Sequence, residues 1–519
     1  MTSATAIEVR ELTASLRLLG VRLRAEGGNL RVEAPSGVVG PELLALVKKH
    51  KDALVRVLAD GEADRVGTQL RRLTEVPRDS WPLSEVQERL FYPQFADPET
   101  VDYHITGLYR IDGVLHVERL ENAFRAVIGR HEGFRTGFGW AGGDPVQSVH
   151  PEVAFELERA GPAPFDPREL GDFVRPFDLA RPPLLRGRLH TVGPARHVLL
   201  VDSHHLVFDA VSWPVFLADL RRAYDGQELR PLSPAAKEYA AWQRDLATPH
   251  MARLGRYWEE LLTPDPASKG TAVPTHPGLA LGEEEVRSVR RALEGSTAAS
   301  IRRFCRQHVL TPSMVYLAAY TLALQDLGGR SEAVVGFPVD VRADAGLSSV
   351  IGPLVNTVLV RAAATGSAGR PCTVREYLER IRSQVTSAIE HSHYPYDAMI
   401  EAAAARRNVR EDPVVDGFFN YTGIDAPQAP DDLFAPVARE SAALPLLPCL
   451  SSRYAATLIV AEEPGLVRLE VERDSTQISE QTCRRLVDTV TFLVTELIAD
   501  VDRPLGRLSN GLAAVTGCG

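Results

Sequence analysis

Two adjacent histidines and an aspartate shortly after them are the most concentrated chemistry in the sequence. His204 and His205 end a buried-strand pattern that begins at His197, and Asp209 precedes a helix that the pattern predicts to reach about Tyr224. Histidine has an ordinary pKa of about 6.5, so it can take a proton from an amine or a hydroxyl near neutral pH. Adjacent strand residues point to opposite faces, so the pair is not expected to share a metal ion. The pattern favours proton transfer by a histidine, with a structural pair bonded to the backbone as the alternative.

The residues around the pair narrow the chemistry further. Asp209 could orient a histidine ring or stabilise the loop, and Ser212 is expected to cap the following helix rather than to act as a nucleophile. The sequence has no G-x-S-x-G nucleophile elbow, no P-loop and no dinucleotide fingerprint. If His205 is the catalytic group, direct acyl transfer without a covalent enzyme intermediate is the simplest interpretation.

Length and composition bound the rest of the molecule. At about 150 residues per domain, 519 residues suggest three to four domains, and the ordinary globular composition argues against a disordered or fibrous chain. A net charge of −10 does not favour nucleic-acid binding, and no apolar run is long enough for a membrane span. The widely spaced cysteines argue against a disulfide framework or a zinc site, which fits a reducing cytoplasm. They are Cys305, Cys372, Cys449, Cys483 and Cys518.

Residues 1–60 are predicted to form a small unit of their own. A helix over about 9–19 is followed by two alternating runs, 21–25 and 30–34, which predict a β-hairpin, and a second helix follows over about 41–58. Such a unit exposes a strand edge, and edges recruit other chains by strand addition. An ordinary N-terminal subdomain packed on the body is the alternative.

The body is predicted to contain two α+β halves. Residues 61–79 are expected to be a linker, partly helical around 69–73, and 80–262 form the first half. Four prolines and two glycines interrupt the pattern at 263–278, which is expected to be a second linker. The second half is expected to cover 279–510, with a tail at 511–519. Strong helix patterns lie at 118–131 and at 300–327, the latter broken near Pro312.

The stretch from His204 to Ala210 resembles the HHxxxDG signature of condensation domains from nonribosomal peptide synthetases. Further stretches resemble other motifs of that family in the family's order: SxAQxRL at 84–90, RHExLRT at 130–136, YxxWQ at 239–243, GxPVxxR at 336–342, IGxFVNT at 351–357 and HQDYPFE at 391–397. The resemblance implies an α+β fold of two chloramphenicol acetyltransferase-like lobes, which form a V-shaped pseudo-dimer with the active site in a tunnel between them. It also implies two carrier proteins that deliver substrates on phosphopantetheine arms, with no cofactor bound by the enzyme itself.

Site roles follow from the same resemblance. His205 matches the catalytic histidine, and His204 is expected to pack or support the loop. Asp209 matches a structural aspartate, which would form a buried ion pair with Arg342 and join the lobes. Asn356 would lie near the site, where it could bond to the substrate or to the developing oxyanion.

The first sixty residues resemble the TubC-like, or β-hairpin, docking domains that precede some condensation domains. These domains capture a short C-terminal segment of an upstream carrier protein. Arg22, Arg24 and Arg31 alternate along the hairpin and would suit an acidic tail. The expected partners are therefore a donor carrier protein and an acceptor, which is either a second carrier protein or a small molecule.

Three departures from the family pattern leave alternatives open. Ala210 replaces the glycine of the motif, which could narrow the tunnel, restrict a backbone angle, or disable the site and leave a non-catalytic docking scaffold. The run 211–213 is similar to that of epimerization domains, which share the fold. The sequence ends at Gly519 without an adenylation or carrier domain, so a free-standing enzyme that forms amides or esters is expected, with a piece cut from a longer protein as the alternative.

Overall fold

A computed structural model gives the conformation of most of the chain. The structure describes residues 12, 16, 21–26, 29–33, 41–59, 62–75, 78–166, 169–245, 248–263, 288–342, 346–364, 372–407, 415–422, 433–436, 454–463, 465–474, 477–506 and 508. The expected second linker and the C-terminal tail lie almost wholly outside these described residues.

The histidine pair ends the central strand of the N-terminal lobe. This lobe has a five-stranded sheet in the order β14-β4-β9-β8-β7, with β4 (His104–Asp112), β7 (Glu158–Ala160), β8 (Leu185–Gly193) and β9 (Arg196–His204). Helices α6 (Val117–Arg130) and α8 (Ser212–Tyr224) join its hydrophobic core. The predicted strand at 197–201 and both helix predictions in this lobe are confirmed.

A second layer of the N-terminal lobe lies beside the end of β9. It contains a three-stranded sheet, β3 (Trp81–Pro82), β6 (Asp144–Val149) and β5 (Thr136–Ala141). Helix α5 (Glu85–Ala96) starts with a capping box, in which Ser84 accepts from the Gln87 N–H and the Gln87 side chain accepts from the Ser84 N–H. The 3-10 turn Glu132–Arg135 and the helices α7 (Glu169–Phe173) and α9 (Ala236–Gln243) complete the lobe.

The C-terminal lobe is built on a six-stranded sheet in the order β10-β16-β15-β13-β11-β12. The strands are β10 (Ser288–Glu294), β11 (Glu332–Asp340), β12 (Val355–Ala363), β13 (Gly417–Thr422), β15 (Ala456–Glu463) and β16 (Leu466–Arg473). Its helices are α11 (Gly295–His308), α12 (Pro312–Gly328), α14 (Val374–Glu390), α15 (Tyr396–Arg407) and α16 (Glu480–Ala499). Helix α12 is buried through most of its length, and the predicted break near Pro312 separates it from α11.

The lobes exchange segments, so they do not divide the chain at residue 262. Helix α10 (Pro249–Leu261) packs in the C-terminal core, where Trp258 is fully buried and its Nε1–H donates to the His391 carbonyl at 3.1 Å. In return β14 (Ala435–Pro436) pairs with β4, and Phe434 is buried in the N-terminal core. The chain therefore crosses to the C-terminal lobe before α10, earlier than the sequence predicts.

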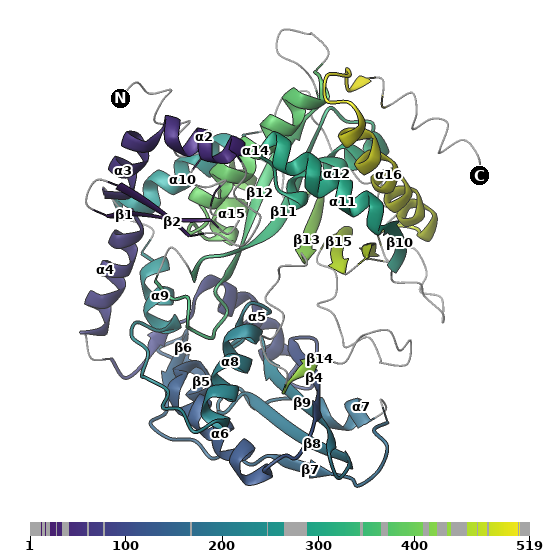
Figure 1. Cartoon of the computed structure of the whole chain (residues 1–519). Helices are drawn as coiled ribbons and strands as arrows, with labels where there is room; N and C mark the ends of the chain where they lie inside the picture. Colours follow the sequence, from purple (N-terminus) through teal and green to yellow (C-terminus); the bar gives the residue numbers. More distant parts are fainter. Residues whose placement is uncertain are drawn as a thin grey trace.

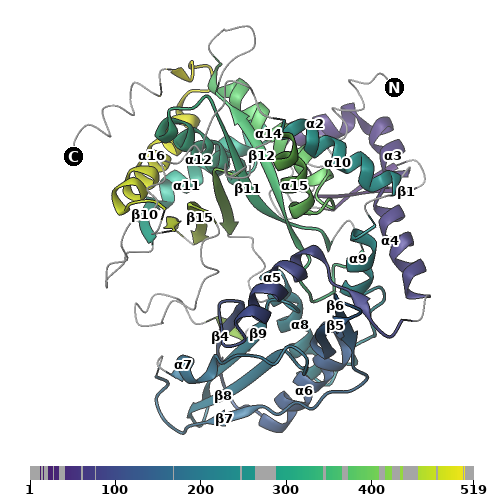
Figure 2. The same ribbon diagram turned by 180° about the vertical axis from the view of Figure 1, so that it is seen from behind.

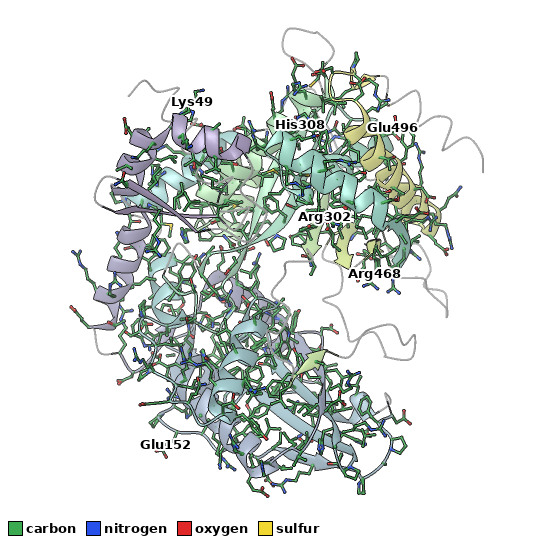
Figure 3. All side chains as sticks on the ribbon, viewed as in Figure 1. Lys49, Glu152, Arg302, His308, Arg468 and Glu496 are labelled. Atoms are coloured by element: carbon green, nitrogen blue, oxygen red, sulfur yellow. The ribbon has the colours of Figure 1, made fainter. Side chains whose placement is uncertain are left out.

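Figure 1 shows the two lobes meeting near α9 and diverging on the other side, where β14 and β15 face each other. The view from behind shows the same arrangement (Figure 2). With the described side chains drawn, the lobes still diverge on that side, and Glu152 marks the outer end of the N-terminal lobe (Figure 3). This confirms the predicted α+β fold of two lobes in a V.

The N-terminal module contains the predicted hairpin, β1 (Arg22–Glu26) and β2 (Asn29–Glu33), as an antiparallel pair. The helix predicted over 41–58 is instead two helices, α2 (Pro41–Lys49) and α3 (Lys51–Ala59). The chain turns at His50, whose side chain is buried and whose carbonyl accepts from the N–H of Leu54 at 2.9 Å. Val47 of α2 and Leu54 of α3 both belong to the small core of the module. The predicted first helix lies mostly outside the described residues.

The segment expected as a linker forms a continuous helix, α4 (Glu62–Thr74). Its buried side chains Val66 and Leu70 enter a hydrophobic cluster with residues of α9 and α10. Packing against the body, rather than the polar average of the segment, therefore decides its conformation.

Candidate active site

The ring of His205 is fixed through one nitrogen. The Phe208 carbonyl lies 2.8 Å from Nδ1, and because a carbonyl can only accept, Nδ1 carries the proton and Nε2 holds a lone pair. The backbone N–H of His205 donates to the Tyr103 carbonyl at 2.8 Å. Burial lowers the pKa of His205, although the nearby Asp209 charge opposes part of the shift. The residue is therefore neutral near pH 7, with its basic nitrogen Nε2 available.

His204 is a structural residue. It is fully buried, and its Nδ1 accepts from the Leu206 N–H at 3.0 Å while Nε2–H donates to Gln94 Oε1 at 3.1 Å. Burial, and then the neighbouring His104, hold the pKa of His204 well below its ordinary value. Both ring nitrogens are used, which fits the supporting role expected for His204.

Asp209 and Arg342 form a buried bridge between the lobes. Arg342 Nη2 lies 2.7 Å from Asp209 Oδ1, and both side chains are 2 % exposed. The N–H of Leu354, in the C-terminal half of the chain, donates to the other carboxylate oxygen at 3.0 Å. Arg342 also donates to the carbonyls of Val350 and Gly352 and to Asp340. Burial lowers the pKa of Arg342, but the charges and hydrogen bonds of Asp209 and Asp340 together outweigh it and raise this pKa above its ordinary value, so Arg342 stays charged.

Ser212 does not cap helix α8 as expected. Its hydroxyl donates to Asp209 Oδ1 at 2.8 Å, and its own N–H donates to the same oxygen at 2.9 Å. The carboxylate of Asp209 therefore accepts the hydrogen bond from the first N–H of the helix, and the Ser212 hydroxyl is a second donor to it. The hydroxyl also lies 3.0 Å from Arg342 Nη2, so Ser212 belongs to the bridge.

Ala210 occupies the glycine position of the motif without backbone strain. Among the described residues, Val309 is the one non-glycine residue with a positive φ, so Ala210 does not need glycine's conformational freedom. Ala210 is exposed, which places its methyl group on the surface of the loop rather than in the core. The expected restriction of a backbone angle is therefore not found.

Asn356 makes different contacts from those expected. Its amide group donates to the carbonyls of Ser392 and Tyr394, each at 2.7 Å, and its Oδ1 accepts from the Thr357 N–H. Because both amide hydrogens are used, an oxyanion contact from Asn356 is contradicted. The residue instead ties β12 to the segment before α15.

Two family models match this chain. The condensation domain model matches residues 78–510, and the TubC N-terminal docking domain model matches residues 9–60. The chain belongs to the condensation-domain family.

Related proteins are much longer than this condensation-domain chain. Bacitracin synthase 2 of Bacillus licheniformis is 27% identical over 436 residues, which is 81% of this chain and 16% of that protein. Tyrocidine synthase 3 of Brevibacillus parabrevis is 27% identical over 465 residues, or 86% of this chain and 7% of that protein. The chain thus spans less than a fifth of the length of these relatives.

Solved structures share the fold. The X-domain from teicoplanin biosynthesis matches with a TM-score of 0.66 at 21% identity, over 83% of this chain and 98% of that one. The condensation domain from the monacolin K polyketide synthase MokA matches with a TM-score of 0.66 at 21% identity, over 82% of this chain and 99% of that one.

Two other motif residues of the condensation domain make buried contacts in this region, although the sequence assigned them no role. Gln87 of the SxAQxRL-like stretch donates through Nε2 to the Leu206 carbonyl at 3.1 Å, directly after the histidine pair. His131 of the RHExLRT-like stretch donates to Asp219 Oδ2 at 2.8 Å, and its Nδ1 lies 3.4 Å from the Ile351 N–H. Gln94, the partner of His204, lies outside the matched motifs, so the sequence does not indicate its contact with His204.

The three arginines that are expected to contact a carrier-protein tail lie on the hairpin. Arg22 and Arg24 are in β1, and Arg31 is in β2, where it is exposed and is the cross-strand partner of Arg24. The hairpin is a two-stranded sheet among the described residues. In the part of the chain that the structure describes, no group of three metal-binding side chains is placed to hold an ion. None of the described helices is both long and apolar enough to cross a bilayer.

Proposed function

We propose that this protein is an acyltransferase. It would move an acyl or peptidyl group from the phosphopantetheine thioester of a donor carrier protein to an amine or hydroxyl acceptor. The observation that carries the proposal is the ring of His205, whose Nδ1–H is used by the Phe208 carbonyl while Nε2 keeps its lone pair. The lowered pKa of His205 keeps that lone pair available near neutral pH.

The proposed reaction is one addition and one elimination. The acceptor's nitrogen or oxygen attacks the thioester carbonyl carbon, and its proton passes to Nε2 of His205. The tetrahedral intermediate then collapses, the carbon–sulfur bond breaks, and the proton moves from Nε2 to the departing sulfur. An amide or ester and a free phosphopantetheine thiol result, and no covalent bond to the protein forms. A hydroxyl acceptor needs the base more than a free amine does, because an unprotonated amine is already nucleophilic.

The N-terminal module supplies the proposed contact with the donor carrier protein. A two-stranded hairpin leaves strand edges to which an extended segment can add. Arg31 is exposed on this hairpin, and the register places another arginine opposite it. Arginine side chains bind carboxylates well, so an acidic tail would suit this hairpin. The acceptor would arrive on a second carrier protein or as a free small molecule.

The catalytic proposal is tested with donor carrier proteins loaded with acyl thioesters, an acceptor, and product detection by intact-protein mass spectrometry. We expect the wild type to form product and His205→Ala to lose about 10²–10⁴-fold in rate. His116→Ala, an exposed histidine on the same lobe, is the matched control and should retain activity. Near-wild-type turnover in His205→Ala would sink the proton-transfer role. Product from Ala210→Gly alone would mean that Ala210 has disabled the natural protein.

The pH dependence gives a second measure of the same role. Because the pKa of His205 is lowered, its basic form persists below the ordinary histidine pKa of 6.5. In a plot of rate against pH, the midpoint of the acid limb should therefore lie below pH 6.5. A midpoint at or above that value would contradict a buried His205 as the base.

The docking proposal is tested by calorimetry with a peptide that carries an acidic C-terminal tail. Arg31→Glu should weaken binding about three- to tenfold, because reversing an exposed charge costs on the order of 1 kcal/mol. Arg72→Glu makes the same charge change at an exposed position of α4 and should have little effect. Equal affinities of wild type and Arg31→Glu would show that charge does not select the tail.

A further inference from the structure

Helix α4 connects two family modules but is matched by neither. The docking model ends at residue 60 and the condensation model begins at residue 78, while α4 covers Glu62–Thr74. Figures 1 and 2 both show α4 beside α9, running from the hairpin module along the junction of the lobes. The helix is therefore placed to connect the docking module to the catalytic body.

The contacts of α4 are those of a packed helix. Leu70 is fully buried and Val66 is 4 % exposed, so the helix has an apolar face one turn long against the body. Gln69 Oε1 accepts from the indole Nε1–H of Trp242 in α9 at 2.5 Å. A polar bond beside a buried pair fixes the rotation of α4 as well as its position.

The cluster that receives α4 also supports the inter-lobe bridge. It contains Val341, Leu347, Val350 and Leu354, which belong to the segment around Arg342. The Val350 carbonyl accepts from Arg342 Nε at 3.0 Å. The Leu354 carbonyl accepts from the Val341 N–H at 3.1 Å. The backbone that aims Arg342 at Asp209 is thus packed from one side by the cluster to which α4 contributes.

The path from α4 to the catalytic loop has few steps. Arg342 and the Leu354 N–H both bind the carboxylate of Asp209. Asp209 directly follows Phe208, whose carbonyl holds Nδ1 of His205. Packed contacts and hydrogen bonds thus connect α4 to the loop without a gap, although such continuity becomes coupling only if a change at one end is felt at the other.

We propose that α4 is a positioning element for His205: Leu70, and Gln69 through Trp242, support the cluster whose members next to Arg342 fix the Asp209 loop. Loosening α4 should therefore loosen the histidine loop, even though α4 touches neither substrate nor His205. Helix α4 would also hold the docking module in place, because the module is joined to it directly. The catalytic consequence rests on the proposed function, but the structural coupling can be measured without any reaction.

The measurement is the rate at which diethyl pyrocarbonate modifies His205, followed in the full chain by tandem mass spectrometry over a pH series. Only neutral imidazole reacts, so the rate profile gives both the pKa and the access of reagent. The groups that act on this pKa are Asp209 and the backbone of its own loop, and Arg89 of α5. Adjacent His204 is fully buried with both ring nitrogens bonded, so it serves as an unreactive reference.

Leu70→Ala is the main variant. Because burial is the main cause of the lowered pKa, a looser loop should admit water and shift the pKa of His205 up toward 6.5. The limiting modification rate at high pH, where the ring of His205 is fully neutral, should rise about threefold or more, as expected for a locally opened segment. Leu70→Met keeps the buried volume and should restore wild-type behaviour.

Leu54→Ala is the matched control, because Leu54 is equally buried but belongs to the core of the hairpin module. It should leave the pKa and reactivity of His205 unchanged. Trp242→Phe removes the indole N–H while keeping an aromatic ring, and should shift the pKa of His205 less, in the same direction. This variant also tests the proposal if Leu70→Ala does not fold. The proposal is overturned if His205 is unchanged in folded Leu70→Ala or Trp242→Phe, or if Leu54→Ala alters it equally.

Discussion

Two carboxyl groups at the junction of the lobes sit in opposite surroundings. Asp209, in the N-terminal lobe, accepts from Arg342 and from the Leu354 N–H. Glu85, at the start of α5, accepts from the Ala398 N–H of α15 at 3.2 Å and lies close to Asp397. Asp209 is therefore paired with a cation from the C-terminal lobe, whereas Glu85 lies beside a second negative charge, that of Asp397.

This difference decides which contact changes with pH. Charges that leave water are tolerated only when partners replace the lost solvation. Burial, and then the Asp397 charge, raise the pKa of Glu85 to about 7, and Arg89 offsets only part of this. Asp209 is paired with a cation beside the loop that carries His205, whereas the Glu85 contact changes its charge near neutral pH.

Removal of the Asp209–Arg342 ion pair should have the largest effect on stability. Asp209→Ala leaves Arg342 buried without its counter-charge, which typically costs about 3–5 kcal/mol. Unfolding in urea, followed by circular dichroism, should show a lower midpoint, and acyl transfer should be lost with it. An unchanged midpoint would show that the Asp209–Arg342 pair does not hold the junction.

A second substitution separates the pair from its parts. Asp209→Ala combined with Arg342→Met removes both charges, so the double variant should be more stable than Asp209→Ala alone. If the two losses simply add, the buried charge is not the cause of the first result.

The sequence predicted the bridge better than the residues around it. His205, Asp209 and Arg342 were found because their motif spacing carries the family's site. Ser212 and Asn356 were given wrong contacts, because a hydroxyl or an amide can satisfy many partners, and some of the actual ones, such as Arg342 for Ser212, lie far away in the sequence. Asn356, for example, bonds to the carbonyls of Ser392 and Tyr394.

The sequence of helix α4 carries a helical pattern, but the polar composition of the segment favours a linker. Val66, Leu70 and Leu73 have the spacing of one helix face, yet the segment around them is strongly polar. The cluster that buries Val66 and Leu70 comes from residues more than 160 positions away, such as Tyr239 and Trp242. A short polar helix is stabilised by such tertiary packing rather than by its own propensity.

The second effect in size concerns Glu85. Its folded pKa of about 7 lies above the ordinary 4.5, so the folded state binds more protons between these values. Its contribution to stability is therefore greatest below pH 4.5 and is lost as the pH rises to 7. Glu85→Gln removes this loss and should melt about 2–4 °C above wild type at pH 8, with a difference near zero at pH 4.5.

Glu152→Gln is the matched control for this substitution. Glu152 is exposed at the outer end of the N-terminal lobe, so the same chemical change should not alter the melting temperature with this pH dependence (Figure 3). A Glu85→Gln variant that is destabilised at pH 8 would mean that the charged form of Glu85 strengthens the junction.

The smallest effect should come from Asp397→Asn, which separates burial from charge. Asp397 lies 3.6 Å from Arg89 in a partly exposed pair, so its loss should cost less than about 1 kcal/mol. Without the Asp397 charge, the pH at which stability falls should move below 7 but stay above 4.5, since burial is the larger cause. Melting curves of Asp397→Asn and wild type across pH 4 to 8 measure that midpoint. A midpoint that does not move would assign the whole shift to burial, and one that drops to 4.5 would assign it to Asp397, so either result would redraw the contrast with the fully paired Asp209.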